Sequence, residues 1–205
     1  MDDPFFVAGT AVPDWLSVVD RRVRVTSKSA KQQVEEGDPT VAAVAAGIVQ
    51  HHYDDAWFHG TAVFVSLNLE FSKGIRQRYP EDTSFRPSFL AHILVEILLD
   101  AELISRQPDR LVAYYEVLDA FDAARISKAV NQMATRPAER LEAFIPRFSA
   151  ERFLYDYAED GKLLGRLNRV MQRVGMPTLQ EDFCEFLPLA RGRVKEHADE
   201  LLAGG

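Results

Sequence analysis

Cysteine is nearly absent from the sequence, since Cys184 is the only one among 205 residues. One thiol can form neither an intrachain disulfide nor a zinc site of clustered cysteines, and such a chain suits a reducing compartment. Positive charge is also in deficit, because 24 Lys and Arg stand against 31 Asp and Glu and the formal net charge is -7. We therefore expect no nucleic-acid partner for the chain as a whole.

Long apolar runs are missing as well. The longest, Val41 to Val49, is well below the ~18 residues that a transmembrane helix needs. The start of the chain, Met1 to Pro4, lacks the basic and then apolar layout of a secretory signal. We therefore expect a soluble, cytoplasmic protein that does not bind membranes.

Strand-like alternation is scarce and no segment repeats at a fixed period, which excludes solenoids and propellers. The glycine, proline and capping residues of the chain are instead spaced as in a helical protein. Gly37-Asp38-Pro39 places a C-terminal glycine, an N-cap aspartate and a first-turn proline in succession, which predicts a helix over 39–59. The next segment, 61–79, predicts a helix whose buried face consists of Val63, Leu67, Phe71 and Ile75.

Pro87 opens a further helix, over about 87–104, that is apolar almost all round, so we expect it to be central and buried. Other boundaries follow from prolines, from Gly175 and from a capping box at Thr178–Glu181. Helix breaks are expected at Pro108, Pro137 and Pro146, and a first helical turn at Pro13. The fold prediction is all-α: one domain over 1–205 with a basic segment at 20–36 and C-terminal helices over about 149–203.

Four of the five histidines fall on the helices predicted over 39–59 and 87–104. Two trios recur at every fourth position and line one stripe of their helix: His51, Asp55 and His59 on the first, and His92, Glu96 and Asp100 on the second. A carboxylate buried among apolar neighbours costs several kcal/mol unless a cation or dense hydrogen bonding compensates. Nitrogen and oxygen donors without thiolate suit Mn, Fe, Zn or Ni, as one or two ions.

The same residues also have a purely structural interpretation. A helical histidine is more often a hydrogen-bonded core residue than a ligand, so a buried His–carboxylate network in a non-catalytic binding protein is one alternative. A DinB-like metal-dependent helical-bundle enzyme is another, although that type normally uses three histidines and no carboxylate. The sequence has no His-Glu-x-x-His, no ferritin-like Glu-x-x-His pair and no Gly-x-Ser-x-Gly, so no single motif decides between these alternatives.

Two features near the N-terminus add to these candidates. Asp14 is equally consistent with helix capping and with a metal-ligand role. Five positive charges follow with no acid between the first and the last of them: Arg21, Arg22, Arg24, Lys28 and Lys31. This local inversion of charge suits a phosphate or an acidic protein, and a solvated basic helix face explains it equally well.

At these residues the chain resembles the acyl-carrier-protein phosphodiesterase family, an all-α relative of the HD-domain metal-dependent phosphohydrolases. The resemblance covers nearly the whole chain in one order: Gly9 to Asp14, Gly47 to Asp55 as Gly-Ile-x-x-His-x-x-x-Asp, the helix around His92, Arg152 to Tyr157, and Leu167 to Val174. His59 and His92 stand where the family has further Asp residues, and Glu96 stands where it has Asp followed by His. The resemblance implies an HD-domain-like bundle in which Asp14, His51 and Asp55 occupy metal-binding positions.

The family removes the 4′-phosphopantetheine arm from holo acyl carrier protein, so the resemblance implies a metal-dependent phosphodiesterase that activates water. The expected metal ligands are Asp14, His51, Asp55, His59, His92 and Glu96. We expect His52, Arg21 and Arg22 near the substrate, and the basic stretch is expected to hold a phosphate or acyl carrier protein.

Overall fold

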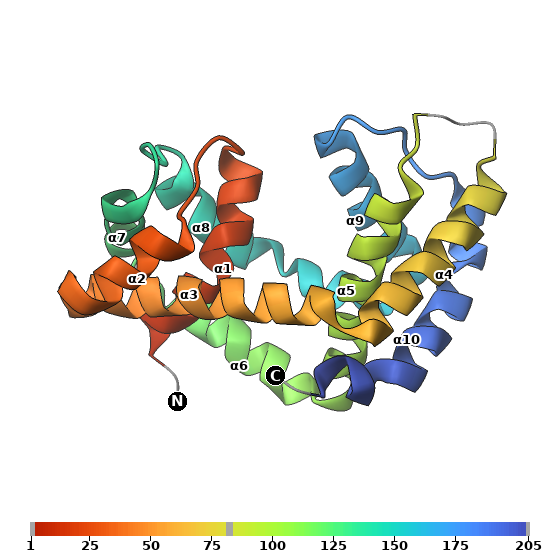
Figure 1. Ribbon diagram of the computed structural model, residues 1–205, viewed down its shortest axis with the longest axis horizontal. Helices are drawn as coiled ribbons and strands as arrows, with labels where there is room; N and C mark the ends of the chain where they lie inside the picture. The colour runs from red at the N-terminus through yellow and green to blue at the C-terminus, as the bar shows by residue number, and fades with distance from the viewer. Residues whose placement is uncertain (1–2, 81–83, 204–205) are drawn as a thin grey trace. The chain divides into compact units, whose positions relative to one another are not determined.

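The computed structural model describes residues 3–80 and 84–203, and these residues are predominantly helical (Figure 1). In chain order the helices are α1 (Pro4–Val19), α2 (Ser27–Glu36), α3 (Pro39–Gly60), α4 (Ala62–Arg78), α5 (Pro87–Arg106), α6 (Pro108–Asp119), α7 (Ala123–Met133), α8 (Leu141–Glu151), the 3-10 helix η1 (Phe153–Ala158), α9 (Asp160–Arg173), the 3-10 helix η2 (Glu181–Glu185) and α10 (Leu187–Leu202). The only β-type pairing in these two ranges is an isolated bridge between Val25 and Ala134. The all-α prediction is confirmed.

The described chain divides into two compact units, whereas the sequence predicts one domain. The first unit contains the residues up to Ala56 together with Leu111–Arg152. The second contains Trp57–Arg110 and the residues from Phe153 onward. Two of the boundaries fall inside α3 and α6, so each of these helices contributes residues to both units. The single domain over 1–205 therefore stays a prediction.

In the first unit, α1 and α3 meet through a pair of glycines. A Cβ atom on Gly9 would lie 2.2 Å from the carbonyl oxygen of Val44, and one on Gly47 would lie 2.1 Å from the carbonyl oxygen of Phe6. Real carbon atoms do not approach backbone oxygens so closely, so both positions require glycine for the two helices to touch. These are the glycines of two segments that carry the family resemblance, and here they act as packing residues.

The first helix begins nine residues earlier than the sequence predicts. The Oδ1 atom of Asp3 accepts a hydrogen bond from the N–H of Phe5 at 2.8 Å and caps the helix there, so Pro13 lies inside α1 and not at its first turn. The helix continues past Pro13 because Trp15 is buried beyond it, edge-on against two phenylalanine rings. Asp14 is consequently an exposed mid-helix residue, and its predicted capping role is wrong.

Two further boundary predictions are wrong for similar reasons. Pro146 lies inside α8, where the buried residues Ile145 and Ser149 hold the helix together across it. The capping box at Thr178–Glu181 is not formed, and the last α-helix starts only at Leu187. The side chain of Asn168 explains the delay, because it binds both the N–H and the C=O of Leu179, at 2.6 and 3.1 Å, and so holds that backbone outside a helix.

In the second unit, α5 packs against α4, α10 and η1, and seven of its residues are buried. Its predicted central position is therefore confirmed. The buried face of α4 consists of Phe64, Leu67, Phe71 and Ile75, so it starts at Phe64, whereas Val63 is only half-buried. None of the described helices combines the length and the apolar composition required to cross a membrane.

Replacing either packing glycine with alanine should destabilise the protein. We expect Gly9→Ala or Gly47→Ala to lower the free energy of unfolding by about 1–3 kcal/mol, because the new methyl group forces α1 and α3 apart. Gly165→Ala and Gly192→Ala are matched controls, since these helical glycines have open space around them. The controls should raise the free energy of unfolding by up to about 1 kcal/mol, because alanine favours the helix. Thermal melting followed by circular dichroism measures both effects, and destabilisation in all four variants would contradict the packing role.

Candidate metal centre

Three polar side chains meet in the second unit at the corner between α3 and α4. His59 lies in the last turn of α3, and His92 and Glu96 lie one turn apart on α5. Thr61 fixes the corner: its N–H donates to the carbonyl of Phe58 at 3.2 Å, and its hydroxyl caps α4 through the N–H of Phe64. The end of α3 is thereby held against the middle of α5.

Both imidazoles converge on one carboxylate oxygen. The Nε2 atom of His59 lies 2.7 Å from Oε1 of Glu96, and the Nε2 atom of His92 lies 3.3 Å from the same oxygen. The two imidazole rings are themselves close, with centroids 4.3 Å apart. Each imidazole must carry a hydrogen on Nε2 to donate to this oxygen. Glu96 therefore accepts from two different helices, which ties the end of α3 to α5.

An aromatic wall lies behind the three side chains. The ring of Phe64 is buried, and its centroid lies 4.7 Å from that of His59 and 5.0 Å from that of His92. Phe58 packs on the same ring, edge-on at 5.0 Å. The outer side remains open to solvent, because the side chains of His59, His92 and Glu96 are 24%, 37% and 38% exposed. The apolar neighbours of His92 and Glu96 on their helix predict that both side chains project into the interior, whereas the structure places them at its edge.

Two opposing effects set the charge of Glu96. Burial, the largest single effect, raises the pKa of this carboxyl group because it disfavours the ionised form. The hydrogen bonds from His92 and His59, together with the charges of these imidazoles, outweigh burial and hold the pKa of Glu96 below its ordinary value. The carboxylate is therefore ionised at neutral pH and available as an anionic ligand.

The chemistry of these donors suits a transition-metal ion. One ligand atom from each of His59, His92 and Glu96 lies within 4.8 Å of the other two, and within 3–80 and 84–203 no other group of three His, Cys, Asp or Glu residues does so. Two imidazoles and one carboxylate form the donor set of catalytic zinc sites and of non-haem iron sites. Binding through Nε2 requires that the hydrogens now directed at Glu96 move to Nδ1 or leave, so metal affinity should rise with pH.

The remaining predicted ligands belong to the first unit. His51 hydrogen-bonds through Nδ1 to the carbonyl oxygen of Thr10 at 2.9 Å, and Asp14 and Asp55 are exposed. The structure brings none of these three predicted ligands into a three-residue cluster in the part of the chain that it describes. Asp100, the last member of the second stripe, is also exposed.

The residues predicted near the substrate have structural contacts in the first unit. The Nε2 atom of His52 lies 3.1 Å from the carbonyl oxygen of Val25. Arg22 binds both carboxylate oxygens of Asp20, each at 3.1 Å, and Arg21 is exposed. The structure thus gives His52 a backbone contact and Arg22 a carboxylate partner.

The aromatic wall formed by Phe58 and Phe64 was not among the features predicted from the sequence. The signal was present in the spacing of α4, because Phe64, Leu67 and Phe71 recur at three and four positions, as a helical face requires. The sequence prediction instead assumed a buried residue at every fourth position, which placed Val63 and not Phe64 on the buried face. The contact of Phe64 with His59 could not be read from α4 alone, since it depends on the corner at Thr61.

Comparisons of the chain with protein-family models, with curated proteins and with solved structures give no match. The resemblance to the acyl-carrier-protein phosphodiesterase family and the HD-domain-like topology therefore stay predictions from the sequence.

Acidification should remove the stability that Glu96 contributes. Because its pKa in the folded state is lowered, this contribution is fully present above the unfolded-state pKa and is lost as the pH falls through the folded-state pKa. We expect the free energies of unfolding of the wild type and of Glu96→Gln, measured by urea denaturation with chelator present, to converge between about pH 7 and about pH 3. A difference that stays constant over this range would contradict the stabilising role of the ionised carboxylate.

Proposed function

We propose that the chain binds a divalent transition-metal ion through His59, His92 and Glu96 and hydrolyses a phosphoester at this site. The observation that carries the proposal is the convergence of two Nε2 atoms on one carboxylate oxygen. A site with three protein ligands keeps coordination positions open, which is typical of catalytic centres and not of structural ones. The phosphoester class comes from the sequence resemblance, and Mn, Fe, Zn and Ni are the candidate ions.

The ion, the charge of Glu96 and the ring of Phe64 have different roles in this proposal. An ion held by His59, His92 and Glu96 would supply a Lewis acid for a phosphoryl oxygen and for water. The single negative charge of Glu96 leaves a divalent ion partly uncompensated, which favours an anionic substrate. Phe64 packs against both His59 and His92, so it fixes the ring orientations and excludes water from the inner side. The solvent-exposed outer side gives the substrate its approach.

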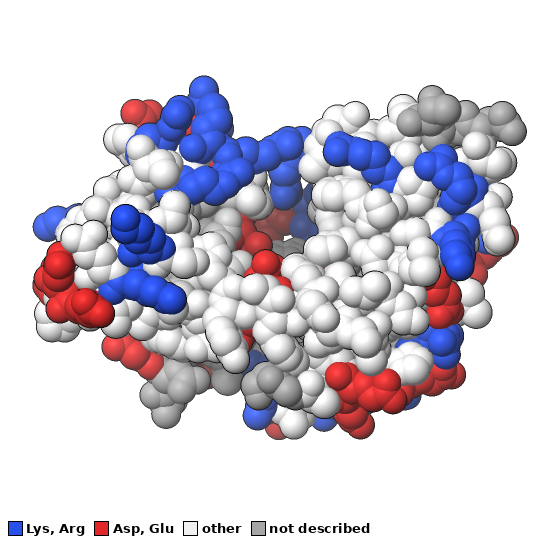
Figure 2. All heavy atoms as spheres, viewed as in Figure 1, with Lys and Arg blue, Asp and Glu red and all other residues white. Residues whose placement is uncertain are grey.

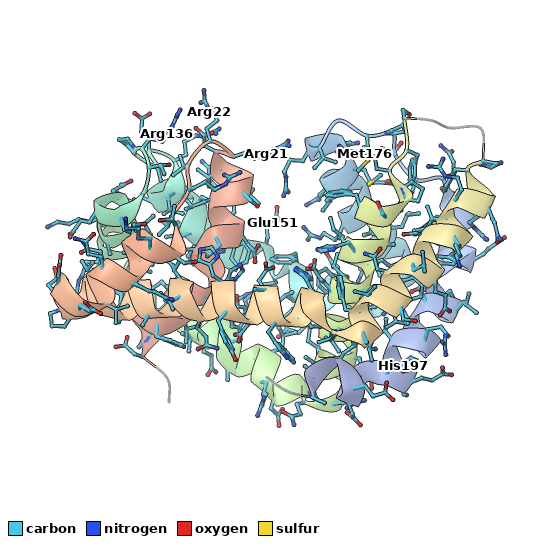
Figure 3. All side chains as sticks on the ribbon, in the orientation of Figure 1. Arg21, Arg22, Arg136, Glu151, Met176 and His197 are labelled. Carbon is cyan, nitrogen blue, oxygen red and sulfur yellow. The ribbon has the colours of Figure 1, made fainter. Side chains whose placement is uncertain are left out.

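The basic loop surface of the first unit supports an anionic substrate or partner. We use this name for Arg21, Arg22, Arg24, Arg136 and Arg140, all of which are exposed. Two chain segments meet in it, because the N–H of Thr135 donates to the carbonyl of Arg24 at 2.8 Å beside the bridge between Val25 and Ala134. Arg21, Arg22 and Arg136 project from the same end of the unit (Figure 3), where basic side chains gather (Figure 2).

The arginines of the basic loop surface suit carboxylate or phosphate groups. Guanidinium groups recognise both anions through paired hydrogen bonds, as Arg22 does with the carboxylate of Asp20. We therefore propose a phosphoester, or acyl carrier protein as its acidic carrier, as the partner of the basic loop surface.

Asp14, His51 and Asp55 remain proposed ligands on the strength of the resemblance. One contact agrees with such a role for His51. Metal-bound histidines usually direct the second ring nitrogen at a carbonyl or a carboxylate, and Nδ1 of His51 lies 2.9 Å from the carbonyl of Thr10, which leaves Nε2 for a ligand.

Metal content and turnover test the proposed function together. We expect purified wild-type protein to bind Zn²⁺ or Mn²⁺ at micromolar concentration and to hydrolyse bis(p-nitrophenyl) phosphate. His92→Ala and Glu96→Gln should lose at least about tenfold in metal affinity and most of the turnover, with the helical circular dichroism retained. His197→Ala is the matched control, because this histidine of the same unit lies on α10 (Figure 3), pairs with Glu200 and does not belong to the three-residue group. Wild-type metal content and turnover in His92→Ala and Glu96→Gln would defeat the assignment.

One observation favours the alternative that the chain is a non-catalytic binding protein. The hydrogen bonds of Glu96 to His59 and His92 already satisfy the carboxylate without an ion, as in a structural network that supports a binding protein. A DinB-like enzyme fits less well, because the centre of this group is a carboxylate.

The response of stability to metal separates the two functions. A metal site should raise the free energy of unfolding by about 2.7 kcal/mol at a Zn²⁺ concentration of a hundred times the dissociation constant, and EDTA should reverse the effect. A pure hydrogen-bond network predicts a melting temperature that neither Zn²⁺ nor EDTA changes. Melting curves of the wild type and of His92→Ala, which should respond to zinc less than the wild type does, measure the difference.

A further inference from the structure

A cavity of about 350 Å³ lies in the first unit, between the end of α6, the start of α7 and the C-terminal half of α8. Most of its lining is apolar: Leu118, Phe121, Ala123, Ile145, Pro146 and Ala150. Three polar residues, Asp119, Ser149 and Arg152, complete it. An apolar cavity of this size with a few converging polar groups is the usual form of a small-molecule site.

The three polar residues form one hydrogen-bonded group. Ser149 is buried, and its hydroxyl donates to Oδ1 of Asp119 at 2.5 Å. Arg152 donates through Nη2 to the other carboxylate oxygen, Oδ2. The hydrogen bonds from Ser149 and Arg152 lower the pKa of Asp119, so the pair is ionised. The group as a whole is therefore neutral, although both of its charges are present.

The backbone and side chain of Arg152 are both held in unusual states. Its φ of 46° and ψ of 31° place it in the left-handed region, and it is the only residue other than glycine with positive φ within the described ranges. Its guanidinium lies over the ring of Tyr115, 4.5 Å from the centroid. The Nη1 atom is shielded and has no hydrogen-bond partner among the described residues. Backbone strain in a cavity-lining residue is a feature that binding sites retain.

We propose that this cavity binds a small neutral molecule that carries an amide-type head on an apolar body. The carbonyl of such a head accepts a hydrogen bond from Arg152, and its N–H donates to Asp119, each of whose oxygens has a lone pair left. The body is buried against Leu118 and Ile145. A carboxylate head would lie beside the carboxylate of Asp119 and an ammonium head beside Arg152, so both charged heads are disfavoured.

Three ligands of similar size and different charge test the proposal: benzamide, benzoate and benzylammonium, titrated into the full chain and followed by ¹H–¹⁵N NMR. Benzamide should bind with a dissociation constant on the order of millimolar, as its size allows, and should shift amide signals around the cavity. The two charged ligands should bind at least about tenfold more weakly.

Two variants complete the experiment. Arg152→Lys keeps the charge but loses the planar fork, so benzamide affinity should fall about tenfold. Arg147→Lys, at an exposed position of α8, the helix that ends just before Arg152, should bind as the wild type does. Failure of benzamide to bind, equal binding of a charged ligand, or unchanged affinity in Arg152→Lys would each overturn the proposal. None of these outcomes depends on the metal centre.

Discussion

The arrangement of the second unit around its polar cluster depends on one half-buried carboxylate. Glu96 loses part of its hydration on α5, and the two Nε2 atoms of His59 and His92 replace it at 2.7 and 3.3 Å. Removing one partner of such a group leaves a charge without its compensation, which costs far more than the net value of the hydrogen bond. The end of α3 must therefore stay where His59 can reach α5, and the corner at Thr61 holds it there.

The same constraint explains why the cluster is suited to chemistry. Phe64 covers its inner side and solvent reaches its outer side, so the electrostatic environment is apolar behind the donors and open in front of them. Interactions of charge are stronger against an apolar wall than in water. A divalent ion in place of the imidazole hydrogens would bind all three side chains at once. Two imidazole nitrogens and one carboxylate oxygen within reach of a single ion are the physical reason to regard the cluster as a ligand set.

Sequence rules that use only neighbouring residues correctly predicted the helix starts that depend on neighbouring residues. The proline signals at Pro39 and Pro87 mark the starts of α3 and α5, because first-turn geometry depends on neighbouring residues alone. The prolines at 13 and 146 were misjudged, since burial on both sides of each outweighs the lost hydrogen bond. Tertiary packing of this kind has no signature at the proline itself.

The candidate site could be predicted only in part for the same reason. The spacing of His92 and Glu96 puts them on one face of α5, which helical periodicity shows directly. Periodicity also groups His51 with His59, yet the former contacts the backbone of α1 and the latter contacts α5. Long-range packing decides which helix each residue faces. Gly9 and Gly47 are an example, because the close contact of α1 with α3 depends on two glycines that lie far apart in the sequence.

Diffraction from a crystal of zinc- or manganese-loaded protein, recorded on both sides of the absorption edge of the metal, examines the central claim most directly. A metal ion at the proposed centre should give an anomalous peak about 2.0–2.2 Å from Nε2 of His59, Nε2 of His92 and a carboxylate oxygen of Glu96. Loaded crystals that show no peak among these three side chains, with their Nε2 atoms still directed at the carboxylate oxygen, would contradict it.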